Sequence, residues 1–350
     1  MRREFSKRGR LGMKATRSDV AKLAGVSTAT VSNVINNGHM VKDETAERVW
    51  AAIEQLNYRP NMVARSLSTQ RTMQIGVLLE DIHNPFYGEI VKHIEAAANR
   101  HGYFVNICVT SDNFDNYFDS FISRNLDGVF LAALPSQFNM EKLDALLESG
   151  IKLVTSGNLD VDTSRISTIE HDYETAMAEA VDYLVELGHQ EIVYLNGLDG
   201  QSHNDTRCTT YVKHIQQLGL PVNFVSGTYP YRTDVTSGYE QTMRLLDAGN
   251  HFTAIICCND MMAIGAMRAL SDRGIRVPED VSVMGFDGVL IGKYQQPSLT
   301  TMAVDAKAFG ENVFNLLNNS INRDQIDHLS SHLTLKERES TRKCVSAGKH

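Results

Sequence analysis

Residues 18–36 constrain the fold of this chain more than any other segment. They predict two short helices joined at Gly25, because glycine adopts the left-handed backbone that such a tight turn needs. The first helix begins near Asp19 and carries Val20, Leu23 and Ala24 on one side. This apolar side predicts that the helix packs against a neighbour, as in a helix-turn-helix.

The second helix of this pair combines an apolar side with a small polar side. Ser27 is a candidate N-cap, and the apolar residues Val31, Val34 and Ile35 recur at helical spacing. The opposite side carries Thr28, Ala29, Ser32 and Asn33, with no acidic residue. Short side chains of this kind can hydrogen-bond to base edges or touch thymine methyl groups in a DNA major groove. The alternative is a solvated helical hairpin.

A third helix and a short basic segment follow. The helix is predicted from Val41 to about Leu56, and its apolar residues Val49, Trp50, Ile53 and Leu56 would close a three-helix core. Pro60 ends this pattern, because the residue before proline avoids helical backbone angles. Residues 61–67 are too few for a stable isolated helix, so we expect them to fold on DNA or against a second copy of the chain.

Residues 15–71 resemble the headpiece of the LacI/GalR family, particularly its purine-repressor-like branch. The matching segments are residues 19–21, 24–27, 30–32, 34–36, 56–61 and 64–67. In that family the second helix recognises the major groove, and the hinge leucine, here Leu67, inserts into a central minor-groove step and bends the duplex. A plain linker residue is the alternative for Leu67. The resemblance implies DNA contacts at Thr16, Ser27, Thr28, Ala29, Thr30, Ser32, Asn33, Asn36, Arg65 and Leu67.

The charge of the chain is unevenly distributed. The net charge is −8, yet residues 1–72 hold 13 Lys and Arg against 6 Asp and Glu, so the remainder carries −15. A positive segment that coincides with the helix-turn-helix suits a phosphate backbone, and its DNA affinity should fall with salt. Two interpretations of basic residues 1–12 stay open: a disordered arm that binds phosphates, or a start site assigned upstream of the native one, near Met13.

Targeting and redox features point to the bacterial cytoplasm. No apolar run suits a secretory signal, and no stretch is long enough for a membrane span. The five cysteines are odd in number and lack metal-ligand spacing, and Cys108, Cys257 and Cys258 lie in apolar runs. They are therefore expected to be core thiols in a reducing compartment. We expect no metal and no cofactor.

From residue 73 onward, predicted strands alternate with predicted helices. The strands are residues 75–79, 103–109, 128–131, 151–154, 192–195, 253–256 and 281–284, and helical patterns separate most of them. This alternation predicts an α/β fold with parallel sheets covered by helices on both faces. The length of this part favours two lobes.

In open parallel sheets, ligands bind beyond the carboxyl ends of the strands. Chemically useful residues follow four of these predicted strands: Phe86, Arg207, Asn259, Asp260 and Asp287. Aromatic faces stack on sugar rings or bases, and arginine and carboxylates form charge-assisted hydrogen bonds to hydroxyl groups. The set predicts a neutral polyhydroxy ligand.

This part of the chain also resembles the effector domain of the LacI/GalR family, whose fold is similar to periplasmic sugar-binding proteins. The matching segments are residues 84–87, 126–129, 187–189, 258–266, 277–283 and 285–287. The match implies that Phe86, Arg207, Asn259 and Asp287 line the effector cleft. For Asp260 the alternative is a charge partner of its own helix N-terminus, and for Arg207 and Asp287 it is a structural salt bridge. Residues 198–206 lack the basic residue of the purine-binding branch, which leaves the effector open.

These features predict an α/β protein with a helix-turn-helix headpiece and a two-lobed domain. The expected divisions are residues 1–14 (extension), 15–60 (headpiece), 61–72 (hinge) and 73–345 (effector binding and dimerisation). The predicted function is a homodimeric repressor that binds a palindromic DNA operator under the control of a small effector, most simply a sugar. The alternatives are a purine or nucleoside corepressor, or a phosphocarrier protein. An enzyme is disfavoured, because no Gly-x-Gly-x-x-Gly follows the strand at residues 75–79.

Overall fold

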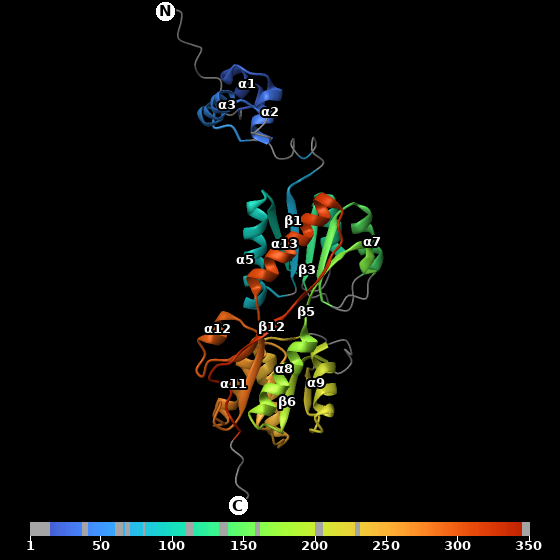
Figure 1. Ribbon diagram of the computed structural model, residues 1–350, viewed down its shortest axis with the longest axis vertical. Coiled ribbons are helices and arrows are strands. Elements are labelled where there is room, and N and C mark those ends of the chain that lie inside the picture. Colours follow the sequence, from blue (N-terminus) through green and yellow to red (C-terminus); the bar gives the residue numbers. More distant parts are fainter. Residues whose placement is uncertain are drawn as a thin grey trace, which may run out of the picture. The chain divides into compact units, whose positions relative to one another are not determined.

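The computed structural model describes residues 15–36, 41–59, 66, 71–79, 81–109, 115–132, 139–157, 162–199, 206–227 and 232–344. They divide into two compact units, residues 1–72 and 73–350 (Figure 1). Arg65 and Leu67 lie outside the described residues, as does the side chain of Asn36, so their expected DNA contacts stay predictions.

The first unit is a three-helix headpiece. Its helices are α1 (Arg17–Ala24), α2 (Thr28–Asn36) and α3 (Asp43–Gln55). Gly25 has φ +66° and ends α1, which confirms the predicted turn. Val20, Val31 and Val49 are fully buried where the three helices meet.

Two predicted core residues of the headpiece are instead exposed. Leu23 is 46% exposed and Trp50 is 51% exposed. Successive helical residues differ by about 100° in direction, so a helix that buries Val49 and Ala52 turns Trp50 toward its flank. The small residues Ala21 and Ala52, together with Tyr58 after α3, fill the core in their place.

The second unit contains two parallel sheets, which confirms the predicted α/β class. We call them the first lobe, with strand order β11-β5-β4-β3-β1-β2, and the second lobe, with order β12-β10-β9-β8-β6-β7. Among the described residues, every strand pair is parallel except β10 with β12. The bounds of the elements up to the first crossing are β1 (Gln74–Leu79), α5 (Pro85–Arg100), β2 (Phe104–Val109), α6 (Asp115–Ser123), β3 (Gly128–Ala132), α7 (Met140–Glu148), β4 (Lys152–Ser156), η2 (Thr163–Arg165) and β5 (Ser167–His171).

The second lobe is built from the middle of the chain. Its elements are α8 (Tyr173–Glu186), β6 (Ile192–Asp199), α9 (Thr206–Gln217), β7 (Phe224–Gly227), α10 (Val235–Asp247), β8 (Ala254–Cys257), α11 (Asp260–Asp272), β9 (Ser282–Asp287), α12 (Leu290–Lys293) and β10 (Thr300–Val304). The chain then returns to the first lobe through α13 (Ala306–Arg323) and β11 (His328–Ser331), and β12 (Leu333–Lys336) ends in the second lobe.

The chain passes between the two lobes at Asp172, Asp305 and His332, which separate consecutive described elements. Asp172 caps α8 and also lies 3.1 Å from the His332 ring nitrogen, so two of these passages are in contact. In Figure 1, α13 lies beside α5 on the first lobe. Because β5 and β10 both run directly into the passages, the carboxyl ends of both parallel sheets face the junction between the lobes.

Within the described ranges, no helix is long and apolar enough to span a membrane. The same residues contain no cluster of three His, Cys, Asp or Glu side chains that could hold a metal ion. Cys257 and Cys258 are buried at the end of β8, as expected for core thiols, whereas Cys108 is only half-buried.

Candidate DNA-binding surface and effector site

The α2 helix presents the small polar surface that the sequence predicts. Thr28, Ala29 and Asn33 are exposed, whereas Thr30 and Ser32 are half-buried beside the valines of the core. The Ser27 hydroxyl accepts a hydrogen bond from the Thr30 amide at 3.0 Å, so Ser27 is the N-cap of α2. No acidic residue lies in the first turn, which leaves the positive helix end open to a phosphate.

Thr16 has a structural role that was not predicted from the sequence. Its hydroxyl lies 3.3 Å from the Asp19 amide and 2.6 Å from the Asp19 carboxylate, and the carboxylate also accepts from the Thr16 amide. This reciprocal pair is a capping box, which fixes the start of α1. Thr16 stays exposed, so a DNA contact remains compatible with its position.

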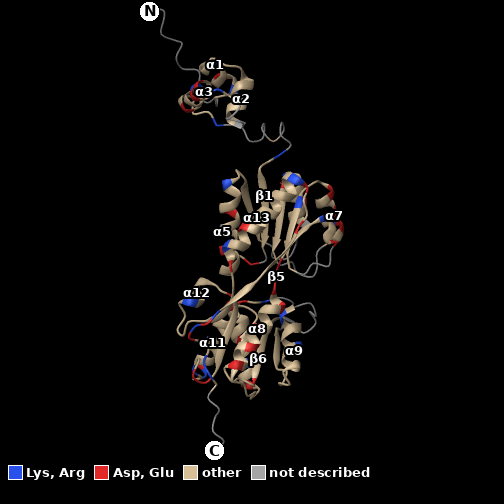
Figure 2. Cartoon of the chain, in the orientation of Figure 1, with Lys and Arg blue, Asp and Glu red and all other residues tan. Residues whose placement is uncertain are grey.

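The net positive charge of residues 1–72 comes from the sequence before and after the three helices. Residues 15–59 hold 5 Lys and Arg and 5 Asp and Glu, so this segment has no net charge. The excess of +7 therefore comes from residues 1–14, from Arg65 and from Arg71. The second unit is acidic, and Figure 2 marks acidic residues in red along its helices; α8 alone has Glu174, Glu179, Asp182 and Glu186 and no basic residue.

An aromatic chain joins the two lobes at their junction. The His171 ring, at the end of β5, lies 5.8 Å from the Phe86 ring, 5.4 Å from Tyr173 and 4.4 Å from Phe309, on which it stacks. Tyr173, at the start of α8, lies 6.2 Å from Phe286 of the second lobe. These contacts run from α5 to β9 without a break.

Arg207 approaches the same aromatic chain from α9. Its guanidinium carbon lies 4.5 Å from the centre of the Tyr173 ring, and one of its nitrogens donates to the Cys258 carbonyl at 2.8 Å. A guanidinium above a tyrosine face gains cation–π stabilisation and is held in a defined direction. We call Phe86, His171, Tyr173, Arg207 and Asp287 the inter-lobe site.

His171 carries a polar atom with no partner inside the inter-lobe site. Among the described residues, its buried Nδ1 has no hydrogen-bond partner. Burial, together with the nearby charge of Arg207, lowers the pKa of His171 to about 3, so the ring is neutral at physiological pH. A buried polar atom without a partner is costly and is a natural contact for a ligand.

Asp287 ends β9 with an unusual backbone. Its φ is +104°, a conformation that costs free energy in any residue other than glycine. Burial and then repulsion from Asp260 raise the pKa of Asp287 well above its usual value, and Arg207 opposes that rise. Strain and a displaced pKa in one buried residue mark a functional position.

Asn259 and Asp260, which the sequence predicts as effector contacts, make hydrogen bonds that stabilise the fold. The Asn259 side chain caps α11 by accepting from the Met262 amide at 2.9 Å, and it donates to the Thr233 carbonyl at 2.9 Å. The Asp260 carboxylate is fully buried and accepts hydrogen bonds from residues that follow β9. Its contacts favour a structural role, although through this turn and not through its own helix N-terminus.

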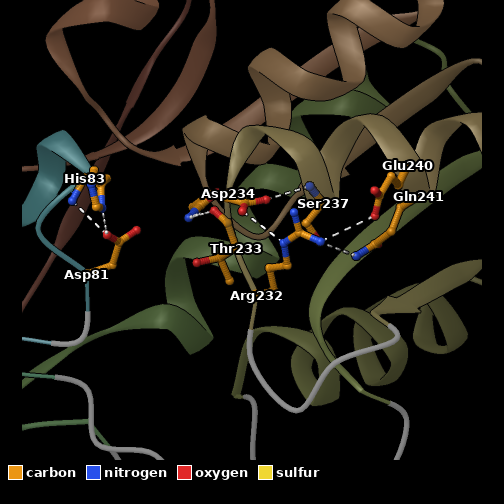
Figure 3. Close-up of polar contacts among 9 residues, drawn as sticks. Asp81, His83, Arg232, Thr233, Asp234, Ser237, Glu240 and Gln241 are labelled. Carbon is orange, nitrogen blue, oxygen red and sulfur yellow. Dashed lines mark hydrogen bonds and ion pairs between the residues drawn. The ribbon is translucent and has the colours of Figure 1, made fainter. Parts of the chain in front are cut away.

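A second polar group lies at the start of α10. Figure 3 shows Arg232 bonded to Asp234 and directed toward Glu240, with N–O distances of 3.0 and 3.6 Å. The amide nitrogen of buried Gln241 donates to the Asn196 carbonyl at 2.9 Å, and among the described residues its side-chain oxygen has no partner. The Asn259–Thr233 bond links this group to the start of α11.

Comparison with known proteins identifies both units. Residues 16–61 match the bacterial regulatory proteins of the lacI family, and residues 181–341 match the periplasmic binding protein-like domain. The chain is 34% identical over 319 residues to the HTH-type transcriptional repressor PurR of Actinobacillus pleuropneumoniae, covering 90% of this chain and 93% of the relative. The chain therefore belongs to the LacI family. As a LacI-family protein it is a DNA-binding transcriptional regulator with an effector-binding domain.

Solved structures of LacI-family proteins have the same architecture. The Lac repressor dimer bound to operator and the anti-inducer ONPF superposes with a TM-score of 0.79 at 27% identity, covering 94% of this chain and all 100% of that one. The complex of the regulator CelR with cellobiose has a TM-score of 0.68 at 26% identity, covering 93% of this chain and 99% of that one. The predicted family and fold are thus confirmed.

Replacing His171 with phenylalanine should make stability less sensitive to acid. Between the unfolded pKa of about 6.5 and the folded pKa of about 3, the unfolded chain binds a proton that the folded protein does not. The free energy of unfolding therefore falls as the pH decreases through this window, and the His171→Phe variant lacks that loss. Thermal unfolding at about pH 7 and about pH 5 measures the difference. His83→Phe, at an exposed position, is the control; an unchanged pH dependence in His171→Phe contradicts the assignment.

Proposed function

We propose that this LacI-family regulator is a repressor that binds a palindromic operator as a homodimer and that a sugar controls its DNA affinity. The observation that carries the effector part is the inter-lobe site, where aromatic rings, Arg207, Asp287 and the unpartnered Nδ1 of His171 meet at the junction of the lobes. This combination offers surfaces on which a ring can stack, and both hydrogen-bond donors and hydrogen-bond acceptors.

The proposed contacts with operator DNA rest on α2. Thr28, Ala29 and Asn33 are the exposed side chains of its polar side, and Ser27 and Thr16 stand at helix starts where phosphates bind. Ala29 offers only a methyl group, so base selection at that position is weak or directed to thymine. Arg65 and Leu67 complete the set, by the resemblance alone, as a phosphate contact and a minor-groove wedge.

The effector class follows from the chemistry of the inter-lobe site. Phe86 and Tyr173 supply apolar faces for a pyranose ring, and Arg207, Asp287 and His171 supply polar contacts for its hydroxyl groups. The cellobiose complex of a relative fits this proposal. The similarity to PurR favours a purine corepressor as the second candidate, for which the aromatic faces are equally suitable.

The signal reaches the headpiece through the passages between the lobes. A ligand that contacts both ends of the aromatic chain stabilises one arrangement of the lobes. That arrangement then favours one relative placement of the hinge segments, residues 61–72, of the two protomers. Such coupling between sites amounts to about 1–3 kcal/mol, which is roughly 5- to 150-fold in DNA affinity. In this role the protein acts inside the bacterial cell without catalysis and without a cofactor.

A thermal-shift screen of the purified chain tests the effector class. The panel contains sugars, sugar phosphates, nucleosides and purines, each in large excess. At a hundredfold excess over the dissociation constant, a ligand adds about 2.7 kcal/mol to the free energy of unfolding. We expect one class of neutral sugars to raise the melting temperature; a rise with purines alone would establish the second candidate instead.

A further inference from the structure

Met73 begins the second unit with an unusual backbone. The two compact units divide between Thr72 and Met73, so the chain enters the first lobe at this residue. Met73 has a φ of +57°, in the left-handed region that residues other than glycine, asparagine and aspartate rarely adopt. Strand β1 begins at the next residue, Gln74. A residue with this backbone persists only if neighbouring contacts hold it in place.

The two backbone polar groups of Met73 bond to opposite neighbours. Its carbonyl accepts a hydrogen bond from the Phe104 amide of β2 at 2.8 Å, and its amide donates to the Asp127 carboxylate at 3.0 Å. Asp127 directly precedes β3, which pairs with β1 on the side opposite β2. In a regular strand, the amide and the carbonyl of one residue face the same neighbour. The chain therefore turns out of the line of β1 at Met73.

Asp127 is itself fixed in the sheet of the first lobe. Its amide donates to the Gln74 carbonyl at 2.9 Å, and its carbonyl accepts from the Lys152 amide of β4 at 3.2 Å. The residue is buried, with 8% of its surface exposed. A buried carboxylate that accepts from a backbone amide forms a charge-assisted hydrogen bond, which is stronger than a bond between neutral groups. The backbone of Asp127 thus continues the sheet, and its side chain holds the amide of Met73.

The side chain of Met73 supplies a third attachment. It is half-buried and packs against the hydrophobic core that contains Ile75 and Ile94. Its terminal methyl group lies 3.8 Å from the position that a Cβ would take at Gly102, in the turn that leads into β2. The amide nitrogen of Met73 belongs to the planar peptide bond with Thr72, so holding this amide fixes the plane in which the chain continues toward Thr72.

We propose that Asp127 is a positioning residue for DNA binding, which holds the Met73 amide and so sets the direction in which the hinge segment, residues 61–72, leaves the first lobe. The proposal rests on the proposed function, in which this segment orders on operator DNA. Asp127 needs no contact with the DNA or with the effector. Its task is to convert an arrangement of the first lobe into a starting direction for the hinge segment.

A fixed starting direction strengthens operator binding because it limits the freedom of the hinge segment before DNA is bound. Releasing Met73 would lengthen the flexible connection, and the added conformational freedom would have to be lost when the segment orders on the operator. A longer flexible connection would also transmit less of a change in the lobes. The attachment of Met73 therefore matters for binding to the operator, whereas contacts of the headpiece with DNA of any sequence do not depend on it.

Hydrogen exchange tests the attachment without DNA. Deuterium uptake of the full chain is resolved to single amides by mass spectrometry with electron-transfer fragmentation. We expect the Met73 amide to exchange slowly in the wild type and much faster in Asp127→Ala, whereas the amide of Val77, inside β1, stays protected in both. Asp127→Asn keeps an oxygen that can accept from the amide, so it should restore slow exchange. Fast exchange at Met73 in the wild type would overturn the proposal.

Operator affinity tests what the attachment does. An operator duplex selected by the wild-type chain from random DNA, and a duplex of scrambled sequence, are titrated with each variant and followed by fluorescence anisotropy. We expect Asp127→Ala to bind the operator roughly tenfold more weakly, because one charge-assisted hydrogen bond no longer orders the start of the hinge segment. Its affinity for the scrambled duplex should not change, and Asp127→Asn should recover most of the loss.

Met73→Val is a second variant that leaves the Asp127 carboxylate in place. A β-branched residue is still less suited to a positive φ, so this variant should reproduce the loss of operator affinity. Asp162→Ala is the control: Asp162 also accepts from a backbone amide of the first lobe, that of Ser164 at 2.9 Å, and its loss should leave operator affinity unchanged. Thermal unfolding shows whether each variant is folded.

Two results would overturn the proposal at the level of DNA binding. One is wild-type operator affinity in Asp127→Ala or in Met73→Val, and the other is an equal loss of affinity for the operator and the scrambled duplex. A wild-type chain that selected no operator from random DNA would contradict the proposed function instead, and the exchange of the Met73 amide would still decide whether Asp127 holds it.

Discussion

Replacing Asp287 with alanine is expected to abolish the effector response and to leave DNA affinity unchanged. The side chain lies at the end of β9 in the inter-lobe site, far in sequence from the headpiece that binds DNA. Loss of a hydrogen bond to a buried polar group in a complex costs about 1.5–3 kcal/mol, which weakens effector binding roughly ten- to hundredfold and so removes the response at effector concentrations near the wild-type dissociation constant. The variant should fold normally, because it removes a strained, buried acid whose ionisation the fold opposes.

Titration calorimetry with the sugar found in the ligand screen measures this loss, and fluorescence anisotropy with operator DNA measures the retained affinity. Glu186→Ala is the matched control, since it removes an exposed acidic side chain of the same unit. Undiminished effector binding by Asp287→Ala would place the effector elsewhere in the protein.

Replacing Gly265 with alanine is expected to destabilise the second lobe strongly. Helices α10 and α11 approach through two glycines: a Cβ at Gly265 would lie 2.0 Å from the Val235 carbonyl oxygen, and one at Gly238 would lie 2.1 Å from the Met262 oxygen. Both obstacles are backbone atoms, which cannot move aside by changing rotamer. We expect a loss of at least about 2 kcal/mol in the free energy of unfolding.

Gly88→Ala is the matched control, and we expect it not to lower the free energy of unfolding. Gly88 is also a helical glycine, in α5, but an added Cβ there meets nothing within 4 Å. Alanine favours the helix over glycine by about 1 kcal/mol, so this variant should be as stable as the wild type or more stable. Chemical denaturation of both variants measures the contrast; equal stabilities would contradict the close packing of α10 and α11.

Local patterns were sufficient to predict most of the headpiece and many strands. The turn at Gly25, the cap at Ser27 and the burial of Val31 all follow from neighbours within four residues. Trp50 shows the limit of this approach, because helical spacing alone does not tell which of two adjacent apolar residues faces the core. Only the packing of α1 and α2 against α3 decides that.

The passages between the lobes explain most of what the sequence did not predict. Strand β5, helix α8 and helix α13 were not identified, and they bring His171, Tyr173 and Phe309 to the inter-lobe site. Phe309 follows His171 by more than a hundred residues, so no spacing rule connects them. A histidine at the end of an apolar strand is the one local signal that was available.

The roles of Asn259 and Asp260 could not be predicted from their positions either. Both follow β8 at the carboxyl edge of the sheet, where ligand contacts are expected. The side chain of Asn259 instead caps α11, and that of Asp260 bonds to a turn that lies 28 residues away along the chain. Such long-range bonds are set by the folded arrangement of α11 against β9 and β10.

The most direct test of effector-controlled DNA binding measures operator affinity and its response to the effector in one experiment. A fluorescent operator, selected by the full chain from random DNA duplexes, is titrated with protein in the absence and presence of each sugar and purine of the panel. The account predicts that one neutral sugar changes operator affinity by roughly 5- to 150-fold, and that the same sugar has no effect on Asp287→Ala. Operator binding that no compound alters, or a change that persists in Asp287→Ala, would contradict it.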